Sequence, residues 1–427
     1  MDSKDVTNSR APPGDVPLTA AQRRALARNL PKSLVLAFFQ VFMVFIPIAV
    51  PFFQQRGLDM QGVLLLQAWF GAVVVLMEVP SGYIADRFGR KRALVAGTLL
   101  LGLGFSVLPF ANGFVALAIF EALLGIGVSL ISGADLALLC DTELALDRAE
   151  GTPGAVRNLH VAHSASEAIA ALLCSALMLW SVDAVVAAQV FAGWIPFAIA
   201  VTLVEPPVHR ALGEDAGERG VRMREVLTHM LGGERVLRYT VLALAFWSLT
   251  TFYAVWLLQQ YWALGGIALV WFGVLWALCN ALSGVAGRFA ATAEARLGAP
   301  ALLLLVGLLP ALGYVAMAGM PFVAGLVLAL GFFVARGLGL VVLRDALNSR
   351  VPSRFRATAN SVASFGFRGA YVVTAPLVGG VLDASDGAPT LEGMEPALWL
   401  LAVGCLLVLR FVLLPLAREI QARTRQV

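Results

Sequence analysis

The sequence is poor in charged residues. Asp, Glu, Lys and Arg make up 14% of its 427 residues, whereas soluble domains have about a quarter. Apolar residues reach 59%, and long runs of them recur along the whole chain. Because a membrane-spanning helix needs about 20 mostly apolar residues, this composition excludes an ordinary soluble domain. It predicts an all-α polytopic membrane protein.

Cysteine is scarce too. The four cysteines have no CxxC spacing and lie in or beside apolar runs, so neither a disulfide framework nor a metal site is indicated. The sequence has no Walker loop and no G-x-S-x-G motif, which are the local signs of nucleotide hydrolysis and of a nucleophile elbow. We therefore expect no enzyme activity, no cofactor and no metal. The net charge of +4 is modest and its cations lie in loops, which argues against a nucleic-acid partner.

Twelve apolar runs divide evenly around a polar interval in the middle of the chain. They lie near residues 33–54, 61–83, 93–111, 114–140, 158–180 and 184–204, then near 239–262, 266–290, 300–318, 321–346, 357–382 and 395–416. The predicted domains are a tail (1–31), a six-helix bundle (32–204), a central loop (205–238), a second six-helix bundle (239–416) and a second tail (417–427).

The loops differ in charge between the two membrane faces. Lys and Arg gather in the tails, the central loop and the loops that follow even-numbered runs, with Arg56 as the clear exception. By the positive-inside rule, we expect both termini to be cytoplasmic in a protein of the cell (inner or plasma) membrane.

The segment between the second and third runs is dense in charge. Residues 82–92 read Gly-Tyr-Ile-Ala-Asp-Arg-Phe-Gly-Arg-Lys-Arg, which predicts a short surface loop because charges are costly in lipid. Gly82 and Gly89 allow close helix approach and a sharp turn. Asp86 and Arg90 are spaced as an i,i+4 pair.

This segment closely resembles the loop motif G-x-x-x-D-R-x-G-R-[RK]-[RK] of the major facilitator superfamily, and the resemblance extends over residues 32–416. It implies a monomeric secondary transporter in which two pseudo-symmetric six-helix bundles move a small-molecule substrate across the lipid bilayer by alternating access. Consistent with a repeat, Ala85-Asp86-Arg87-Phe88-Gly89 has a weaker counterpart in residues 294–298 that keeps only Arg-apolar-Gly.

The resemblance also implies a gating motif. In such proteins the aspartate, here Asp86, meets the start of helix 11, and the second arginine, here Arg90, pairs with an acid near the end of helix 4. Asp135 or Asp141 would serve as that acid. The full set of gating candidates is Gly82, Asp86, Arg87, Gly89, Arg90, Asp135 and Asp141.

Several further charges fall inside predicted spans, where each needs a partner or water. Glu167 and Arg368 each lie about ten residues into their helix, near the midplane and at similar places in the two repeats. They are predicted to face each other across the substrate path, either as a coupling pair or as a purely structural salt bridge. Arg336, in the tenth run, is a candidate counter-charge for Glu121.

Two other acids and one histidine are candidates for proton coupling or substrate binding. Glu121 stands where proton-driven exporters of the superfamily often have the arginine of R-x-x-x-G, and it leaves a protonatable carboxylate there. Glu78 precedes Pro80 and serves either gating or the stabilisation of a kink. His163 shares a helix face with His160 and Glu167; a proton relay and a divalent metal are weighed against no function, which we favour.

Aromatic residues crowd the first and seventh runs. Trp247, Tyr253 and Trp256, together with Gln40 and Gln259, are candidates for lining a cavity that takes an amphipathic ligand. Simple packing is the alternative for each of them. The sequence analysis thus favours proton-coupled export of a small amphipathic compound. Proton- or sodium-coupled uptake of an organic solute and a non-transporting sensor or scaffold stay as alternatives.

Overall fold

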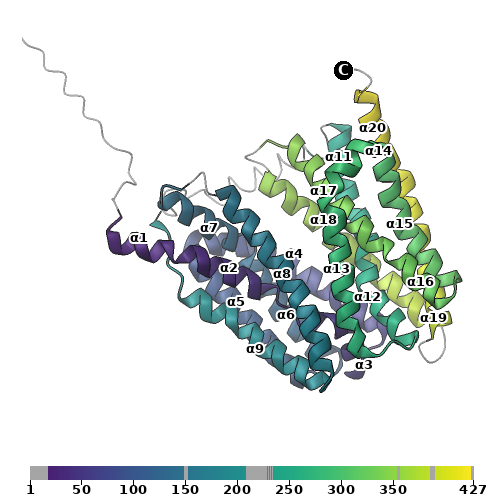
Figure 1. Ribbon diagram of the computed structural model, residues 1–427, viewed down its shortest axis with the longest axis horizontal. Helices are drawn as coiled ribbons and strands as arrows, with labels where there is room; N and C mark the ends of the chain where they lie inside the picture. Colours follow the sequence, from purple (N-terminus) through teal and green to yellow (C-terminus); the bar gives the residue numbers. More distant parts are fainter. Residues whose placement is uncertain are drawn as a thin grey trace, which may run out of the picture.

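The computed structural model describes residues 18–148, 152–207, 228, 230, 232, 234–352, 356–384 and 390–424. In these residues the secondary structure is helical, without strands. Two bundles of helices lie side by side, diverge at one end and meet at the other (Figure 1). We call the end that carries α7, α14 and α20 the terminal face, and the end that carries α3 the opposite face.

The first bundle follows the predicted order of spans. Its helices are α1 (Ala20–Ala27), α2 (Asn29–Gln40), α3 (Ala49–Gln55), α4 (Met60–Phe88), α5 (Arg90–Val107), α6 (Gly113–Ile131), α7 (Ala134–Ala145), α8 (Thr152–Met178) and α9 (Val182–Val201). The predicted tail falls mostly in residues 1–17, outside the described part of the chain.

The second bundle is built from shorter pieces. Its helices are α11 (Arg235–Leu242), α12 (Ser248–Leu264), α13 (Phe272–Arg288), α14 (Ala290–Leu297), α15 (Ala299–Gly319), α16 (Phe322–Ala329), α17 (Gly331–Arg350), α18 (Arg356–Asp383), α19 (Leu391–Val408) and α20 (Leu414–Thr424). Two π-helical turns, Ala243–Trp247 and Leu409–Leu413, join α11 to α12 and α19 to α20.

Eleven segments of the described chain are long and apolar enough to cross a membrane, which confirms the predicted all-α membrane-spanning class. The predicted first span, 33–54, is the exception because residues 41–45 interrupt it between α2 and the short 3₁₀ turn Ile46–Ile48. The second predicted tail also differs, since helix continues through it to Thr424. Most of the central loop lies outside the described residues.

The charged loop predicted at 82–92 is instead a single-residue turn. Helix α4 runs on to Phe88, and Gly89 alone separates it from α5 with φ 101° and ψ 150°. Gly298 separates α14 from α15 in nearly the same conformation, with φ 77° and ψ 151°. Only glycine adopts this region at low cost, so the turn supports the predicted repeat.

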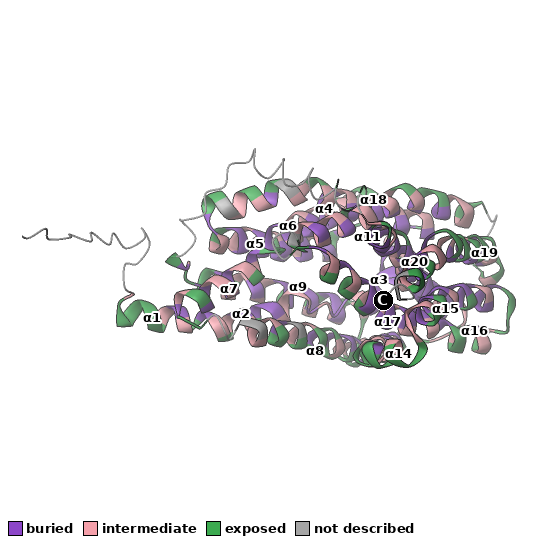
Figure 2. Ribbon diagram, turned by 90° about the horizontal axis from the view of Figure 1, so that it is seen from above, coloured by how far each residue is buried: buried purple, intermediate pink, exposed green. Residues whose placement is uncertain are grey.

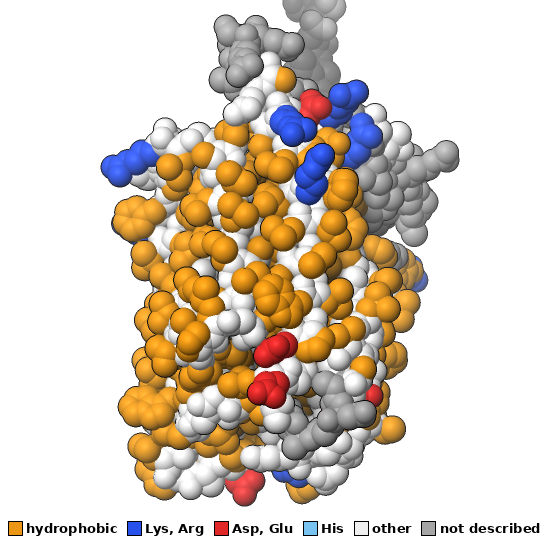
Figure 3. All heavy atoms as spheres, turned by 90° about the vertical axis from the view of Figure 1, so that its right-hand side faces the viewer, with side chains coloured by type: hydrophobic (Ala, Val, Ile, Leu, Met, Phe, Trp, Pro, Cys, Tyr) orange, Lys and Arg blue, Asp and Glu red, His pale blue; other side chains and the backbone are white. Residues whose placement is uncertain are grey.

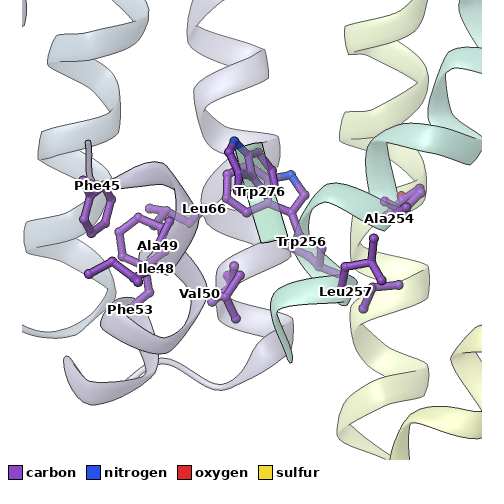
Figure 4. Close-up of a cluster of buried hydrophobic side chains, with 14 of the residues drawn as sticks. Phe45, Ile48, Ala49, Val50, Phe53, Leu66, Ala254, Trp256, Leu257 and Trp276 are labelled. Atoms are coloured by element: carbon purple, nitrogen blue, oxygen red, sulfur yellow. The ribbon is translucent and has the colours of Figure 1, made fainter. Parts of the chain in front are cut away.

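One apolar core joins the two bundles near the opposite face. Phe45, Val50 and Leu66 from the first bundle pack there with Trp256 and Trp276 from the second (Figure 4). Seen from above, buried stretches lie mainly on the inner sides of the helices and exposed ones along the outer edge of the molecule (Figure 2). On the outer surface, apolar side chains form a broad belt while Lys and Arg gather at the terminal face (Figure 3).

Candidate functional site

A cleft separates the two bundles towards the terminal face. It has a volume of about 920 Å³ and is lined by α8 and α13, with Arg157 and Ser164 on one wall and Gly284 and Arg288 on the other. Because its walls belong to different bundles, movement of one bundle against the other would change its width. The cleft therefore lies where an alternating-access path is expected.

The same two helices close the path nearer the opposite face. Gly273 of α13 crosses α8 so tightly that a Cβ there would collide with the Ala171 carbonyl oxygen and lie 2.6 Å from Ser175 Oγ. The backbone N–H of Val274 donates a hydrogen bond to Ser175 Oγ over 3.0 Å. The absent side chain at residue 273 thus permits direct backbone contact between the bundles.

The interrupted first span is held by two buried glutamines. Gln189 of α9 accepts a hydrogen bond from Phe45 N at 3.2 Å and donates to Phe42 O at 3.4 Å. Gln259 of α12 reaches across from the other bundle and accepts from Val50 N at 3.0 Å. These contacts satisfy backbone groups that the break would leave unpaired. Gln259 therefore belongs to the closed end, where it holds α3, instead of lining an open cavity as predicted.

Two acids of the first bundle interact electrostatically with two arginines of the second, and we call these the two couples. Arg336 of α17 acts electrostatically on Glu167 of α8, and Glu78 of α4 acts on Arg368 of α18. Neither couple is in ion-pair contact within 4.0 Å in the described part of the chain. The arrangement pairs the residues differently from the prediction, which set Glu167 opposite Arg368.

Arg368 also lies over an aromatic ring of the first bundle. Its guanidinium carbon is 5.9 Å from the ring centroid of Phe70 on α4. Such a contact stabilises a cation away from bulk water. Each couple therefore has its acid in the first bundle and its arginine in the second.

Glu121 is buried inside the first bundle and has a partner that the sequence analysis missed. Its Oε1 accepts a hydrogen bond from Gln67 Nε2 at 2.8 Å, and both side chains are less than a tenth exposed. The predicted counter-charge, Arg336, instead interacts electrostatically with Glu167. The sequence signal for Gln67 was a single glutamine inside an apolar run, two residues before the pair Trp69-Phe70.

The motif residues form a polar cluster at the terminal end of the first bundle. Arg90 Nε lies 3.1 Å from Asp141 Oδ2, so Asp141 is the predicted acid that pairs. Asp135 instead accepts a local hydrogen bond from Leu136 N at 2.6 Å. The guanidinium of Arg87 lies about 6.0 Å from the ring of Tyr83. The side chain of Asp86 lies outside the described residues, and Gly82 lies within α4.

Glu205 completes this cluster although the sequence analysis did not name it. Its two carboxylate oxygens accept hydrogen bonds from Arg90 N and Lys91 N at 2.8 and 2.7 Å. These N–H groups open α5, where the positive end of the helix dipole favours an anion. The acid follows α9, 115 residues along the chain from Arg90, so only the fold brings it there.

The remaining cavity candidates have mixed roles. Trp247 is a packing residue, because it is 1% exposed and donates its indole N–H to Val306 O at 3.1 Å. The Tyr253 hydroxyl is 2.7 Å from Thr374 Oγ1. Trp256 lies beside Trp276 (Figure 4). The half-buried Gln40 has an Nε2 that finds no hydrogen-bond partner among the described residues.

His163 is half-buried on α8. The side chain of its predicted neighbour His160 lies outside the described residues. Within the part of the chain that the structure describes, no three His, Cys, Asp or Glu side chains are grouped to hold a metal ion.

Comparison with known families and sequences gives a broad match and two short ones. A family model described as Major Facilitator Superfamily matches residues 33–355. An "Uncharacterized transporter" of Buchnera aphidicola subsp. Schizaphis graminum is 35% identical over 72 residues, or 17% of this chain and 18% of that protein. A "Na(+), Li(+), K(+)/H(+) antiporter" of Planococcus maritimus is 36% identical over 88 residues, or 20% of each chain. The chain thus matches only about a fifth of the length of these curated relatives.

Solved structures match over nearly the whole chain. A bacterial homologue of the human lysosomal transporter Spinster has a TM-score of 0.73 at 15% identity, covering 92% of this chain and 97% of that one. The nucleoside transporter NupG gives 0.71 at 11% identity, with 91% and 98% covered. A D-xylose-proton symporter gives 0.69 at 14% identity, with 94% and 99% covered. At such identities the likeness shows the fold alone, and it confirms the predicted one.

Proposed function

Because the chain belongs to the Major Facilitator Superfamily and is an integral membrane transporter of that family, we propose that it moves a small amphipathic organic solute by proton-coupled alternating access. The observation that carries this proposal is the pair of acid–base couples between the bundles. Glu78 and Glu167 belong to one bundle, and Arg368 and Arg336 belong to the other. The attraction between the two bundles then depends on whether each glutamate is ionised.

The coupling follows from elementary electrostatics. An ionised Glu167 attracts Arg336 and favours the state in which the two bundles are close together around these residues. Protonation of Glu167 removes this attraction. Because the couples are surrounded by apolar helices, the attraction is screened less than at a protein surface. Proton binding and bundle movement are therefore linked. An inert scaffold would have no need for such couples between its halves.

The cleft at the terminal face is the proposed entry from the cytoplasm. Its walls carry Arg157 and Arg288, and cations gather at this face (Figure 3), as the positive-inside rule expects of a cytoplasmic side. In this proposal the chain works as a monomer with both termini in the cytoplasm of the cell membrane. The structure then corresponds to a cytoplasm-open state.

The motif cluster is the proposed gate of that face. Arg90, Asp141 and Glu205 fix the start of α5 against α7 and the end of α9, and Asp86 would meet the start of α18 when the bundles close there. Replacing Asp86 with Asn should therefore disfavour the state that is open to the opposite face. Transport that is unchanged in Asp86→Asn would contradict this gating role.

The direction of transport follows from what the solute displaces. A solute that competes with a proton for Glu167 or Glu78 would be exchanged for protons and exported, which is our first candidate. The partial similarity to an antiporter supports it. A solute that displaces an acid from its arginine would instead be taken up with a proton. The couple between Glu78 and Arg368 favours this second candidate.

Proton movement in inside-out vesicles that hold a pH gradient tests the proposal. A pH-sensitive dye reports the gradient while amphipathic cations, anions and sugars are added in turn. We expect one class of solute to change the gradient in the wild-type protein but not in Glu167→Gln. Glu392→Gln is the matched control, because Glu392 is an exposed acid in the first turn of α19. If no solute moves protons while the protein stays folded, the proton coupling is wrong.

A further inference from the structure

Aromatic side chains of α12 and α18 form a continuous wall in the second bundle. The ring of Phe252 lies 5.2 Å from Phe367 and 4.9 Å from Tyr371, in both cases edge to face. Tyr253 lies 5.1 Å from Tyr371. Trp256 lies 6.2 Å from Phe252 and extends the wall towards the apolar closure at the opposite face. We call these five residues the aromatic wall.

Two polar atoms of this wall, and one on Arg368 of the same helix α18, are buried without a hydrogen-bond partner in the described part of the chain. They are Trp256 Nε1, Tyr371 Oη and Arg368 Nε, and the Trp256 and Tyr371 side chains are only 5% and 2% exposed. Buried polar groups are ordinarily paired. All three atoms can donate a hydrogen bond, and two of them can do nothing else. The neighbouring Tyr253 hydroxyl, by contrast, is satisfied by Thr374.

The charge at this place is positive and incompletely balanced. Glu78 of α4 is the charged group that acts on Arg368, and the two form no ion pair within 4.0 Å in the described part of the chain. A guanidinium presents donors in a planar fork that matches a carboxylate. Arg368 is thus placed to accept an anionic group between the bundles.

From this surplus of donors beside an aromatic surface, we propose that the transported solute is an organic anion with a flat apolar body. Its acidic group binds Arg368, with Trp256 and Tyr371 as further donors, and its body packs against the aromatic wall. This inference rests on the proposed transport function for the passage of the solute. The inference adds the charge and the shape of the transported solute to that proposal.

The inference also predicts how the anion and the proton interact. In the described part of the chain, Glu78 of α4 is the titratable group that acts on Arg368, and Tyr371 follows Arg368 by three residues on α18. An ionised Glu78 repels an incoming anion and competes for Arg368, whereas a protonated Glu78 does neither. Anion and proton therefore favour each other's binding. For an anionic solute, co-transport and uptake then take the place of export as the first candidate.

Binding to the purified full-length protein tests the charge of the solute. Equilibrium dialysis is carried out with naphthalene-2-carboxylate, indole-3-acetate and benzoate, and with naphthalen-2-ylmethylammonium as a cation of matched shape. We expect at least one of the anions to bind and the cation not to. Arg368→Gln should weaken anion binding by roughly 10- to 100-fold, the usual effect of losing a charge-assisted contact, and Arg368→Lys should restore part of it.

Arg410→Gln is the matched control. Arg410 also lies over an aromatic ring, 5.7 Å from the centroid of Phe411, but it is exposed on the π-helical turn after α19. This substitution should leave anion binding unchanged. Glu78→Gln should strengthen anion binding, because it removes the charge that competes with the anion for Arg368.

The outcomes separate this inference from the proposed function. Failure of every anion to bind folded protein, preference for the cation, or equal loss in Arg368→Gln and Arg410→Gln overturns the inference. Proton flux driven by a cation or sugar would uphold proton-coupled transport and overturn the anion. If an anion binds in a way that depends on Arg368 but moves no protons, the inference that the solute is an anion is supported. The proposed proton coupling is then contradicted.

Discussion

At the scale of single residues, one glycine and one distant acid define the turn between α4 and α5. Gly89 has φ 101°, and a Cβ there would lie 3.1 Å from the carboxyl carbon of Glu205. The missing side chain therefore lets the carboxylate approach the N–H groups that start α5. The second repeat keeps the glycine turn at Gly298, where a Cβ would meet only Pro300 Cδ at 3.8 Å.

This difference gives a stability prediction. Gly89→Ala adds both backbone strain and a clash with Glu205, whereas Gly298→Ala adds strain alone. A residue other than glycine in this region costs about 1–3 kcal/mol, so both variants should unfold at lower temperature and Gly89→Ala should lose more. Thermal unfolding of purified protein measures the two losses. Equal losses would mean that the Glu205 contact contributes little to stability.

At the scale of elements, the crossing of α8 and α13 shows how the path is closed and opened by the same helices. Near Gly273 the two backbones touch, while Gly284, further along α13, lines the cleft. The interrupted first span adds a second contact between the bundles through Val50 and Gln259. Both contacts must break if the opposite face is to open.

A methyl group at residue 273 should widen this crossing. Gly273→Ala places a Cβ against the Ala171 carbonyl, so we expect it to disfavour the closed opposite face and to shift the population towards opening there. Spin labels at Leu179 and Trp271, which are 74% and 58% exposed, would report a longer distance. Gly284→Ala is the control on the same helix, because nothing lies within 4 Å of its Cβ. The same distance in both variants would contradict the prediction.

At the scale of the whole molecule, the two bundles present an open end and a closed end. The cleft lies towards the terminal face, and the shared apolar core with the crossing at Gly273 closes the other side (Figure 4). In a two-state transporter this is one of the pair of states between which the substrate site alternates. In this state the substrate site is reached from one side of the membrane only.

Cysteine labelling tests this asymmetry. Ser164→Cys lines the cleft and should react with a membrane-impermeant maleimide from the terminal side only, in a Cys140→Ser background. Val50→Cys, at a fully buried position of the closed end, should be protected from both sides. Comparing inside-out with right-side-out vesicles identifies the reactive side. Labelling of residue 164 from the opposite side alone would show that the open end has been wrongly assigned.

The class, the approximate spans and the family motif could all be predicted from the sequence. This is possible because the bilayer demands long apolar helices, and because glycine and clustered charge mark the turns between them. The sequence also identified every in-span acid and arginine of the two couples, since charges stand out against an apolar background. The one-residue turn at Gly89 and the break at residues 41–45 went unpredicted, because a hydrophobic run does not record where its helix is interrupted.

The partner of each of these residues depends on how the helices pack. Glu167 interacts electrostatically with Arg336 and not with Arg368, Glu121 pairs with Gln67, and Glu205 reaches the start of α5. A run of apolar residues predicts that a helix spans the membrane. It does not predict how the helix is rotated about its axis or how closely it approaches its neighbours. Those are set by packing, as at Gly273, where one missing side chain brings two bundles into backbone contact. Partner choice across the path is therefore a property of the packed bundles.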